Sequence, residues 1–138
     1  MTTQQNPYQY ATAIQAQLTS ILSPVPVYAN FNRNYSSQRK FVTWQLRDVH
    51  QPVYTGIYQS NKGIDTPVFQ VSIFAKDMAD AFNISNSVLQ SLHGYAGQFG
   101  GVGGIYVAKT DVYWLYNTYD NELGLHQIVL DCTLDIPS

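Results

Sequence analysis

The chain has 138 residues, the size of one domain, and 45% of them are hydrophobic. Only 12% are charged, about half the usual share, and the net charge of −2 argues against general binding to nucleic acid. The single cysteine, Cys132, excludes an intramolecular disulfide. We expect no membrane span, because no run of about 18 apolar residues occurs. Residues 1–6 also lack the features of a signal peptide.

The uncharged surface positions are rich in tyrosine, with 11 copies in the chain. Protein interfaces deplete lysine and glutamate and enrich aromatic residues, whereas free monomers usually stay soluble through charge. The composition therefore favours a chain whose surface is largely covered by other subunits. A secreted or sugar-binding domain is the alternative, because such domains are also rich in tyrosine and asparagine.

The first predicted element is a helix that begins near Pro7, with Asn6 as its N-cap. Four apolar residues at helical spacing form its expected buried face: Ile14, Leu18, Ile21 and Leu22. Pro24 and Pro26 end the helix. Residues 25–30 then predict a short strand at the edge of a sheet, where prolines are tolerated.

Alternating residues 40–47 predict the next strand, with Val42, Trp44 and Leu46 on one face. The pattern breaks over residues 48–66, where glycine, proline and the turn signal at residues 60–63 interrupt an otherwise partly apolar stretch. Connections of this length are usually functional or disordered. We interpret residues 48–66 as an extended loop or hairpin arm that contacts a neighbouring molecule.

Residues 67–74 alternate strongly and predict a third strand. A second helix is expected to follow, with Asp77 as its N-cap and Asp80 near the positive end of the helix dipole. Its buried face combines Ala81, Ile84, Val88 and Leu92. Gly94 is the expected residue just beyond its C-terminal end.

Residues 94–104 contain six of the nine glycines and are expected to form a flexible loop. Residues 105–116 predict a strand with Val112, Trp114 and Tyr116 on one face, and residues 117–124 predict a turn. The last strand has the clearest alternation, with five residues facing the core: Ile128, Leu130, Cys132, Leu134 and Ile136.

These elements predict an α+β fold in the order α-β-β-β-α-β-β. We expect an antiparallel or mixed β-sheet of about four to five strands, with two helices packed on one face. Residues 1–138 are expected to form one domain.

Catalytic and cofactor signatures are missing from the sequence. The glycine-rich segment leads into a strand and lacks the Gly-Lys-Ser/Thr sequence of a phosphate-binding loop. His50, His93 and His126 are scattered over three elements and make a poor zinc set with one cysteine. The paired acids, Asp77 with Asp80 and Asp131 with Asp135, are explained by helix capping and by the polar face of a strand. We therefore expect no enzyme, no cofactor and no metal.

Four segments in a fixed order resemble the tail terminator, or tail completion, proteins of long-tailed bacteriophages, a group that includes head-to-tail joining proteins. They are residues 18–28 (LTSILSPVPVY), 41–44 (FVTW), 69–77 (FQVSIFAKD), which run into a helix ending at Gly94, and 120–131 (DNELGLHQIVLD). The resemblance spans about residues 10–136. Lys40 stands where the family usually has proline, and the long arm and the glycine-rich loop depart from a minimal member.

The resemblance implies a homohexameric ring that caps the tail tube and presents a surface for the head connector. The expected partners are other copies of the chain, the tail tube protein and a head-completion or connector protein. DNA would pass through the ring without specific recognition. The expected location is the virion tail or neck, assembled in the host cytoplasm.

In this interpretation the arm at residues 53–62 and the loop at residues 33–39 reach neighbouring rings. The expected contact residues are Arg33, Arg39, Tyr54, Ile57, Tyr58 and Lys62. Two alternatives stay open. One is another neck or tail-tube ring protein, and the other is a ligand-binding module that stacks sugars on Tyr113, Tyr116 and Tyr119.

Overall fold

The computed structural model describes residues 7–32, 37–50, 64–101 and 103–137. Its elements in chain order are α1 (Pro7–Leu22), β1 (Val27–Ala29), β2 (Lys40–His50), β3 (Ile64–Ala75), α2 (Met78–Leu92), β4 (Gly97–Phe99), β5 (Ile105–Val107), β6 (Lys109–Asp120) and β7 (Leu125–Pro137). The predicted α+β class and element order are confirmed, with the short β4–β5 pair as an addition between α2 and β6.

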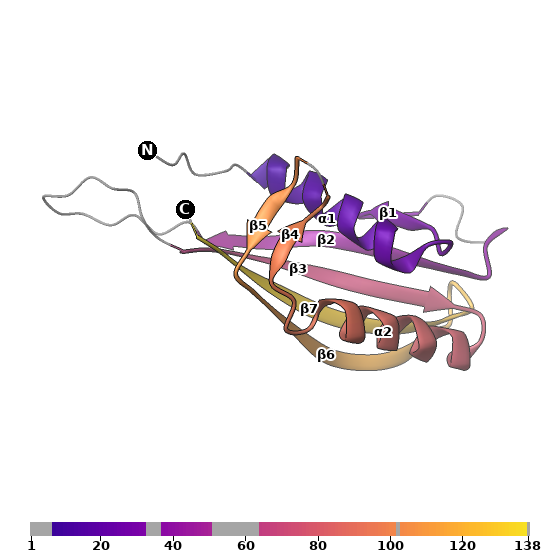
Figure 1. Cartoon of the computed structure of the whole chain (residues 1–138). Helices are drawn as coiled ribbons and strands as arrows, with labels where there is room; N and C mark the ends of the chain where they lie inside the picture. The colour runs from indigo at the N-terminus through magenta and orange to yellow at the C-terminus, as the bar shows by residue number, and fades with distance from the viewer. Residues whose placement is uncertain (1–6, 33–36, 51–63, 102, 138) are drawn as a thin grey trace, which may run out of the picture.

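A mixed five-stranded sheet forms the body of the fold, in the order β1-β2-β3-β7-β6. Strand β1 runs parallel to β2, and the other neighbouring pairs are antiparallel. Strands β2, β3 and β7 therefore lie inside the sheet, and β1 and β6 form the two edges. Both helices cover the same face of the sheet, and the β4–β5 hairpin crosses that face beside α1 (Figure 1).

The core lies between the helices and this face of the sheet. The buried residues of α1 and α2 follow the predicted helical spacing, except that Ile21 is only partly buried, and all five predicted residues of β7 are buried. Tyr10 of α1 is also buried, and its hydroxyl donates a hydrogen bond to the buried carboxylate of Asp65 in β3. This bond ties the start of α1 to the start of β3 and satisfies a polar pair that would be costly to leave unpaired.

The ends of α2 lie at the predicted positions, but the predicted side-chain capping bond at its N-terminus is missing. Asp77 is the N-cap residue, yet its side chain makes no capping hydrogen bond. Its carboxylate instead pairs with Arg39 at 2.7 Å, so the capping explanation of this acid is wrong. At the other end His93 is the C-cap and Gly94 has φ +80°, as the sequence predicts.

Strand β6 departs from simple alternation. Trp114 pairs with Leu130 of β7, but Tyr116 pairs with Val129, so Leu115 is an extra residue in a β-bulge. Since Leu130 and Val129 point to opposite faces, Trp114 and Tyr116 do as well. The expectation that these two side chains share a face is therefore wrong. The strand also continues to Asp120, through residues predicted as a turn.

The face of the sheet opposite the helices holds a second, smaller apolar cluster. Phe41 of β2 and Phe74 of β3 stack with ring centroids 5.0 Å apart, and Tyr28 of β1 meets Phe41 edge-on. Farther along the same face, Arg47 forms an ion pair with Asp131 of β7 across β3. The hydrogen bond to Asp131 and the charge of its carboxylate raise the pKa of Arg47.

The glycine-rich segment is more ordered than expected, because it forms β4, the turn and β5 and packs on α1. A Cβ atom at Gly100 would lie 2.8 Å from the Ala13 Cα. The backbone N–H of Gly100 donates to Gln17 Oε1 at 2.9 Å. The loop and the helix therefore approach as closely as glycine allows.

This close approach predicts a difference between two neighbouring glycines. Gly100 and Gly101 both have positive φ, but a Cβ at Gly101 would meet open space. We expect Gly101→Ala to cost about 1 kcal/mol of unfolding free energy through its backbone conformation alone. Gly100→Ala should cost roughly 1–3 kcal/mol more, because it also overpacks α1. Urea unfolding of both variants measures the difference, and equal losses would show that the packing against α1 is loose.

A second prediction concerns Cys132, which is fully buried in β7. Burial raises the pKa of the Cys132 thiol, and nearby Asp131 raises it further. A thiol whose folded pKa lies above its unfolded value stabilises the fold fully below about pH 8.5, and this stability is lost as pH rises above it. We expect maleimides to label the native chain slowly near pH 7 and the urea-unfolded chain rapidly. Rapid labelling of the native chain would contradict the burial.

Candidate functional site

Strand β6 displays a row of large side chains at one edge of the sheet. Tyr113, Trp114, Leu115, Tyr116 and Tyr119 are each 41–59% exposed, and we call them the aromatic edge. Residues 112–119 contain no charged residue. Phe82 of α2 extends the row, because its ring stacks on Trp114 with centroids 6.2 Å apart. An exposed apolar row on an edge strand is typical of an interaction surface.

The backbone of this edge is only partly open to a partner. The turn after α2 covers its start, because Gly94 N–H donates to the Thr110 carbonyl and Val112 N–H donates to His93 Nδ1 at 3.0 Å. The bulge at Leu115 then interrupts the regular spacing of the outer backbone groups. Both features oppose pairing with a further long strand, so a partner would contact this edge mainly through side chains.

A second uncharged surface lies at the opposite edge of the sheet. The first 32 residues contain no charged residue, so α1 and β1 have none. An open groove of about 640 Å³ runs between them, with Tyr8, Ala11, Thr12, Gln15, Ala16, Val27, Tyr28, Ala29 and Trp44 along it. We call it the α1–β1 groove.

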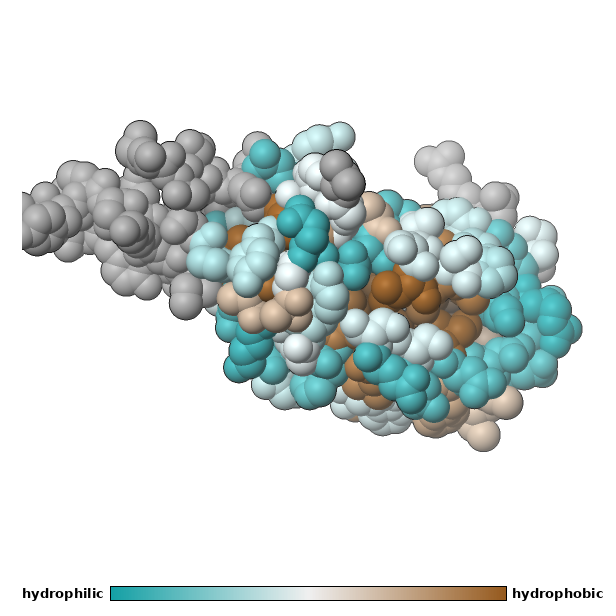
Figure 2. All heavy atoms as spheres, in the orientation of Figure 1, coloured by the Kyte–Doolittle hydropathy of each residue, from teal (hydrophilic) through white to brown (hydrophobic). Residues whose placement is uncertain are grey.

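Figure 2 shows a different hydrophobic area, which lies between α1 and α2 and is surrounded by hydrophilic residues.

Gln15 holds the floor of this groove together. Its amide nitrogen donates to the Val27 carbonyl at 3.0 Å, and its amide oxygen accepts from the indole N–H of Trp44 at 2.5 Å. The Ala29 carbonyl accepts from Phe31 N–H. The backbone N–H and C=O groups of Val27 and Ala29 point away from β2, because the neighbouring residues Pro26 and Asn30 make backbone hydrogen bonds to β2. The outer carbonyls of β1 are therefore already bonded, and this edge too is closed to strand pairing.

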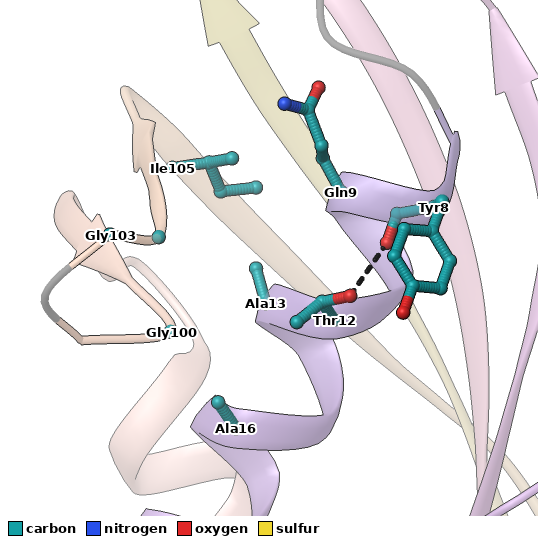
Figure 3. Close-up of a pocket in the computed structure, with 9 residues that line it drawn as sticks. Tyr8, Gln9, Thr12, Ala13, Ala16, Gly100, Gly103 and Ile105 are labelled. Atoms are coloured by element: carbon teal, nitrogen blue, oxygen red, sulfur yellow. Dashed lines mark hydrogen bonds between the residues drawn. The ribbon is translucent and has the colours of Figure 1, made fainter.

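A smaller hollow of about 300 Å³ lies between α1 and the glycine-rich turn. Figure 3 shows Ala13 and Ala16 on the side of α1 that faces Gly100, Gly103 and Ile105. The Thr12 hydroxyl in its wall donates to the Tyr8 carbonyl at 2.9 Å. The described residues of the wall carry no charged group, and their side-chain hydroxyls are those of Tyr8 and Thr12.

Most of the predicted contact residues lie outside the described part of the chain: Arg33, Tyr54, Ile57, Tyr58 and Lys62. Arg39 is described, is exposed and pairs with Asp77. Of the predicted arm, residues 48–50 belong to β2 and pair with residues 66–68 of β3, residues 64 and 65 of β3 pair with β7, and residues 51–63 lie outside the described residues.

The described residues contain neither a cluster of metal ligands nor a membrane-spanning helix. In those ranges no three side chains of His, Cys, Asp or Glu gather where they could hold a metal ion. Neither helix there is long and apolar enough to cross a membrane.

The sequence analysis missed both the aromatic edge as a unit and the α1–β1 groove. The sequence offers the three tyrosines as a sugar platform or, more commonly for such residues, as a core, interface or hairpin feature, and the expected contact residues lie in the arm and in the loop at residues 33–39. The missed signal is the distribution of charge: long stretches at residues 1–32 and 112–119 have none, whereas the chain as a whole is 12% charged.

No protein-family model and no curated protein matches this sequence. Two solved structures share its fold. One is a chain of the virion of a native gene transfer agent particle, with a TM-score of 0.56 and 13% identity over 94% of this chain and 92% of that chain. The other is the sheath/tube terminator, in its extended state, of an extracellular contractile injection system, PVC. It has a TM-score of 0.56 and 12% identity over 99% of this chain, which spans 58% of the terminator's length. The fold is thus shared with a chain of a virion and with a sheath/tube terminator.

Proposed function

We propose that this chain is a structural virion protein of the tail terminator type. Copies form a ring, with six as the expected number, that caps the tail tube and joins it to the head connector. The observation that carries the proposal is the fold shared over nearly the whole chain with a sheath/tube terminator. The uncharged edges of the sheet support it, because ring subunits need large contact surfaces on two sides.

The proposal includes the partners and location that the family resemblance implies. The tail tube protein meets one face of the ring, a head-completion or connector protein meets the other, and the assembled ring belongs to the virion tail or neck after assembly in the host cytoplasm. Contacts with neighbouring rings involve Arg33, Arg39, Tyr54, Ile57, Tyr58 and Lys62. The role is structural and non-catalytic. A different ring of the neck or tail tube is the nearest competing function.

The sugar-binding alternative depends on a platform that the geometry of β6 disfavours. Tyr113 and Tyr116 pair with Asp131 and Val129, which lie on the face opposite the helices. Tyr119 pairs with His126 and meets its ring at 5.0 Å on the other face. Because Tyr119 lies on the opposite face of β6 from Tyr113 and Tyr116, the three rings do not form one flat stacking surface.

The capping role is tested by adding the purified chain to tail tube protein of the same particle as it polymerises. We expect tubes to stop growing, with an extra ring of density at one end, because a terminator occupies the surface where the next tube ring would add. Electron microscopy measures tube length and end density. Unchanged lengths and bare tube ends would contradict the terminator function, and rings stacked along the tube would favour a tube protein.

Residues in the arm give a sharper version of this test. We expect Tyr54→Ala with Tyr58→Ala to raise the concentration needed for capping by about tenfold or more, because buried interface tyrosines each contribute over about 1.4 kcal/mol. Tyr106→Ala is the matched control, since Tyr106 is a 58% exposed tyrosine on β5 with no assigned contact. Equal effects of the two changes would remove the arm from the contact surface.

A further inference from the structure

We infer that the aromatic edge of one copy docks into the α1–β1 groove of the next copy, so that copies join head to tail. The inference rests on the proposed ring and identifies the two surfaces that close it. The first argument is position. Strands β6 and β1 are the opposite ends of one sheet, so a copy carries one surface at each end (Figure 1).

The second argument is chemical match. The aromatic edge offers protruding rings and a leucine, and the groove offers a recess lined mainly by apolar atoms of alanine, valine, tyrosine and tryptophan. Neither surface contains a charged side chain, so docking buries no unpaired charge. The polar groups that the groove does hold are already engaged, since the Gln15 side chain bonds both Val27 and Trp44.

The third argument is the closure of both strand edges. The outer carbonyls of β1 are bonded, and the turn after α2 and the bulge interrupt the outer side of β6. These features oppose extension of one sheet into the next through backbone bonds. Contact through side chains remains, and such a contact fixes geometry through shape rather than through a repeating ladder.

The fourth argument is area. An aromatic side chain buries about 150–250 Å², so five large residues about half exposed offer on the order of 500 Å² when the partner covers both faces of β6, since Trp114 and Tyr119 lie on the helix face and Tyr113 and Tyr116 on the other. A standard stable interface buries roughly 800 Å² per partner. The aromatic edge thus supplies more than half of one side of such an interface, and Phe82 adds to it.

These features favour a head-to-tail contact over a two-fold one. Protruding rings need a recess, and among the described residues the large apolar recess lies at the opposite edge rather than beside β6. A contact between two different surfaces leaves one of each free on every pair of copies. Further copies then add until the rotation closes a ring.

Thiol cross-linking tests this arrangement directly. A chain with Tyr116→Cys and Ala16→Cys carries one new thiol on each surface, and buried Cys132 gives little background. We expect a short bismaleimide to produce a ladder of covalent oligomers that ends at the closed ring. The matched control replaces the β6 position by Ser91→Cys, on an exposed position of α2. Its cross-linked fraction should be at least about tenfold lower, because the thiols lack the high effective concentration of a docked pair.

The outcomes separate this inference from the proposed function. Dimers from Tyr116→Cys alone would indicate a two-fold β6 contact and overturn the inference. Closed rings of the unmodified chain with no ladder from the double variant would overturn it as well, while the terminator proposal stands. Failure to form rings both in solution and on tail tubes would overturn both.

Charge variants give an independent check without cysteine chemistry. We expect Ala16→Glu and Tyr116→Lys each to weaken subunit association by at least about tenfold, because each places an unpaired charge in a dry contact. The chain with both changes should recover much of the loss, since the charges then face each other between copies. Circular dichroism confirms that both positions, which are exposed, leave the fold intact. Additive losses without recovery would overturn the pairing of these surfaces.

Discussion

The pairing of β3 with β7 places two long, largely buried strands inside the sheet, where α1 and α2 cover the same face. Once these strands occupy the middle, β1 and β6 must be edges. An edge strand leaves backbone groups without strand partners, and natural proteins block or cover such edges. This chain blocks both edges locally, with Gln15 at β1 and with His93 and the bulge at β6, while it leaves large apolar side chains exposed. That combination suits contacts with other subunits.

The distribution of charge supports the same division of the surface. The charged pairs Arg39–Asp77, Arg47–Asp131 and Lys109–Asp111 lie away from the α1–β1 groove. They are at least partly exposed and contribute little to stability. The uncharged surfaces are where association can remove apolar area from water without desolvating an ion. Low charge, which looks unfavourable for a free monomer, is thus concentrated where copies are proposed to meet.

Sequence patterns predicted the elements with strong periodicity. The buried faces of both helices and of β7 follow directly from apolar spacing, and the C-cap at His93 and Gly94 follows from glycine chemistry. Local patterns could not predict the bulge at Leu115, because it depends on how β6 matches β7 rather than on β6 alone. The same limit hid the candidate site. Residues of α1 and β1 that line one groove, and the position of β6 at the sheet edge, are consequences of strand order, which periodicity does not specify.

The most direct test of the account is the mass of the purified chain by light scattering over a range of protein and salt concentrations. Contacts between uncharged surfaces should give one closed species of about six 15.5 kDa copies, whose stability is unchanged or increased by salt. The species should not grow further at higher concentration, because a closed ring leaves no free surface. A plateau at two copies would contradict the account, and so would a chain that is monomeric at every concentration and salt level and also forms no ring on tail tubes.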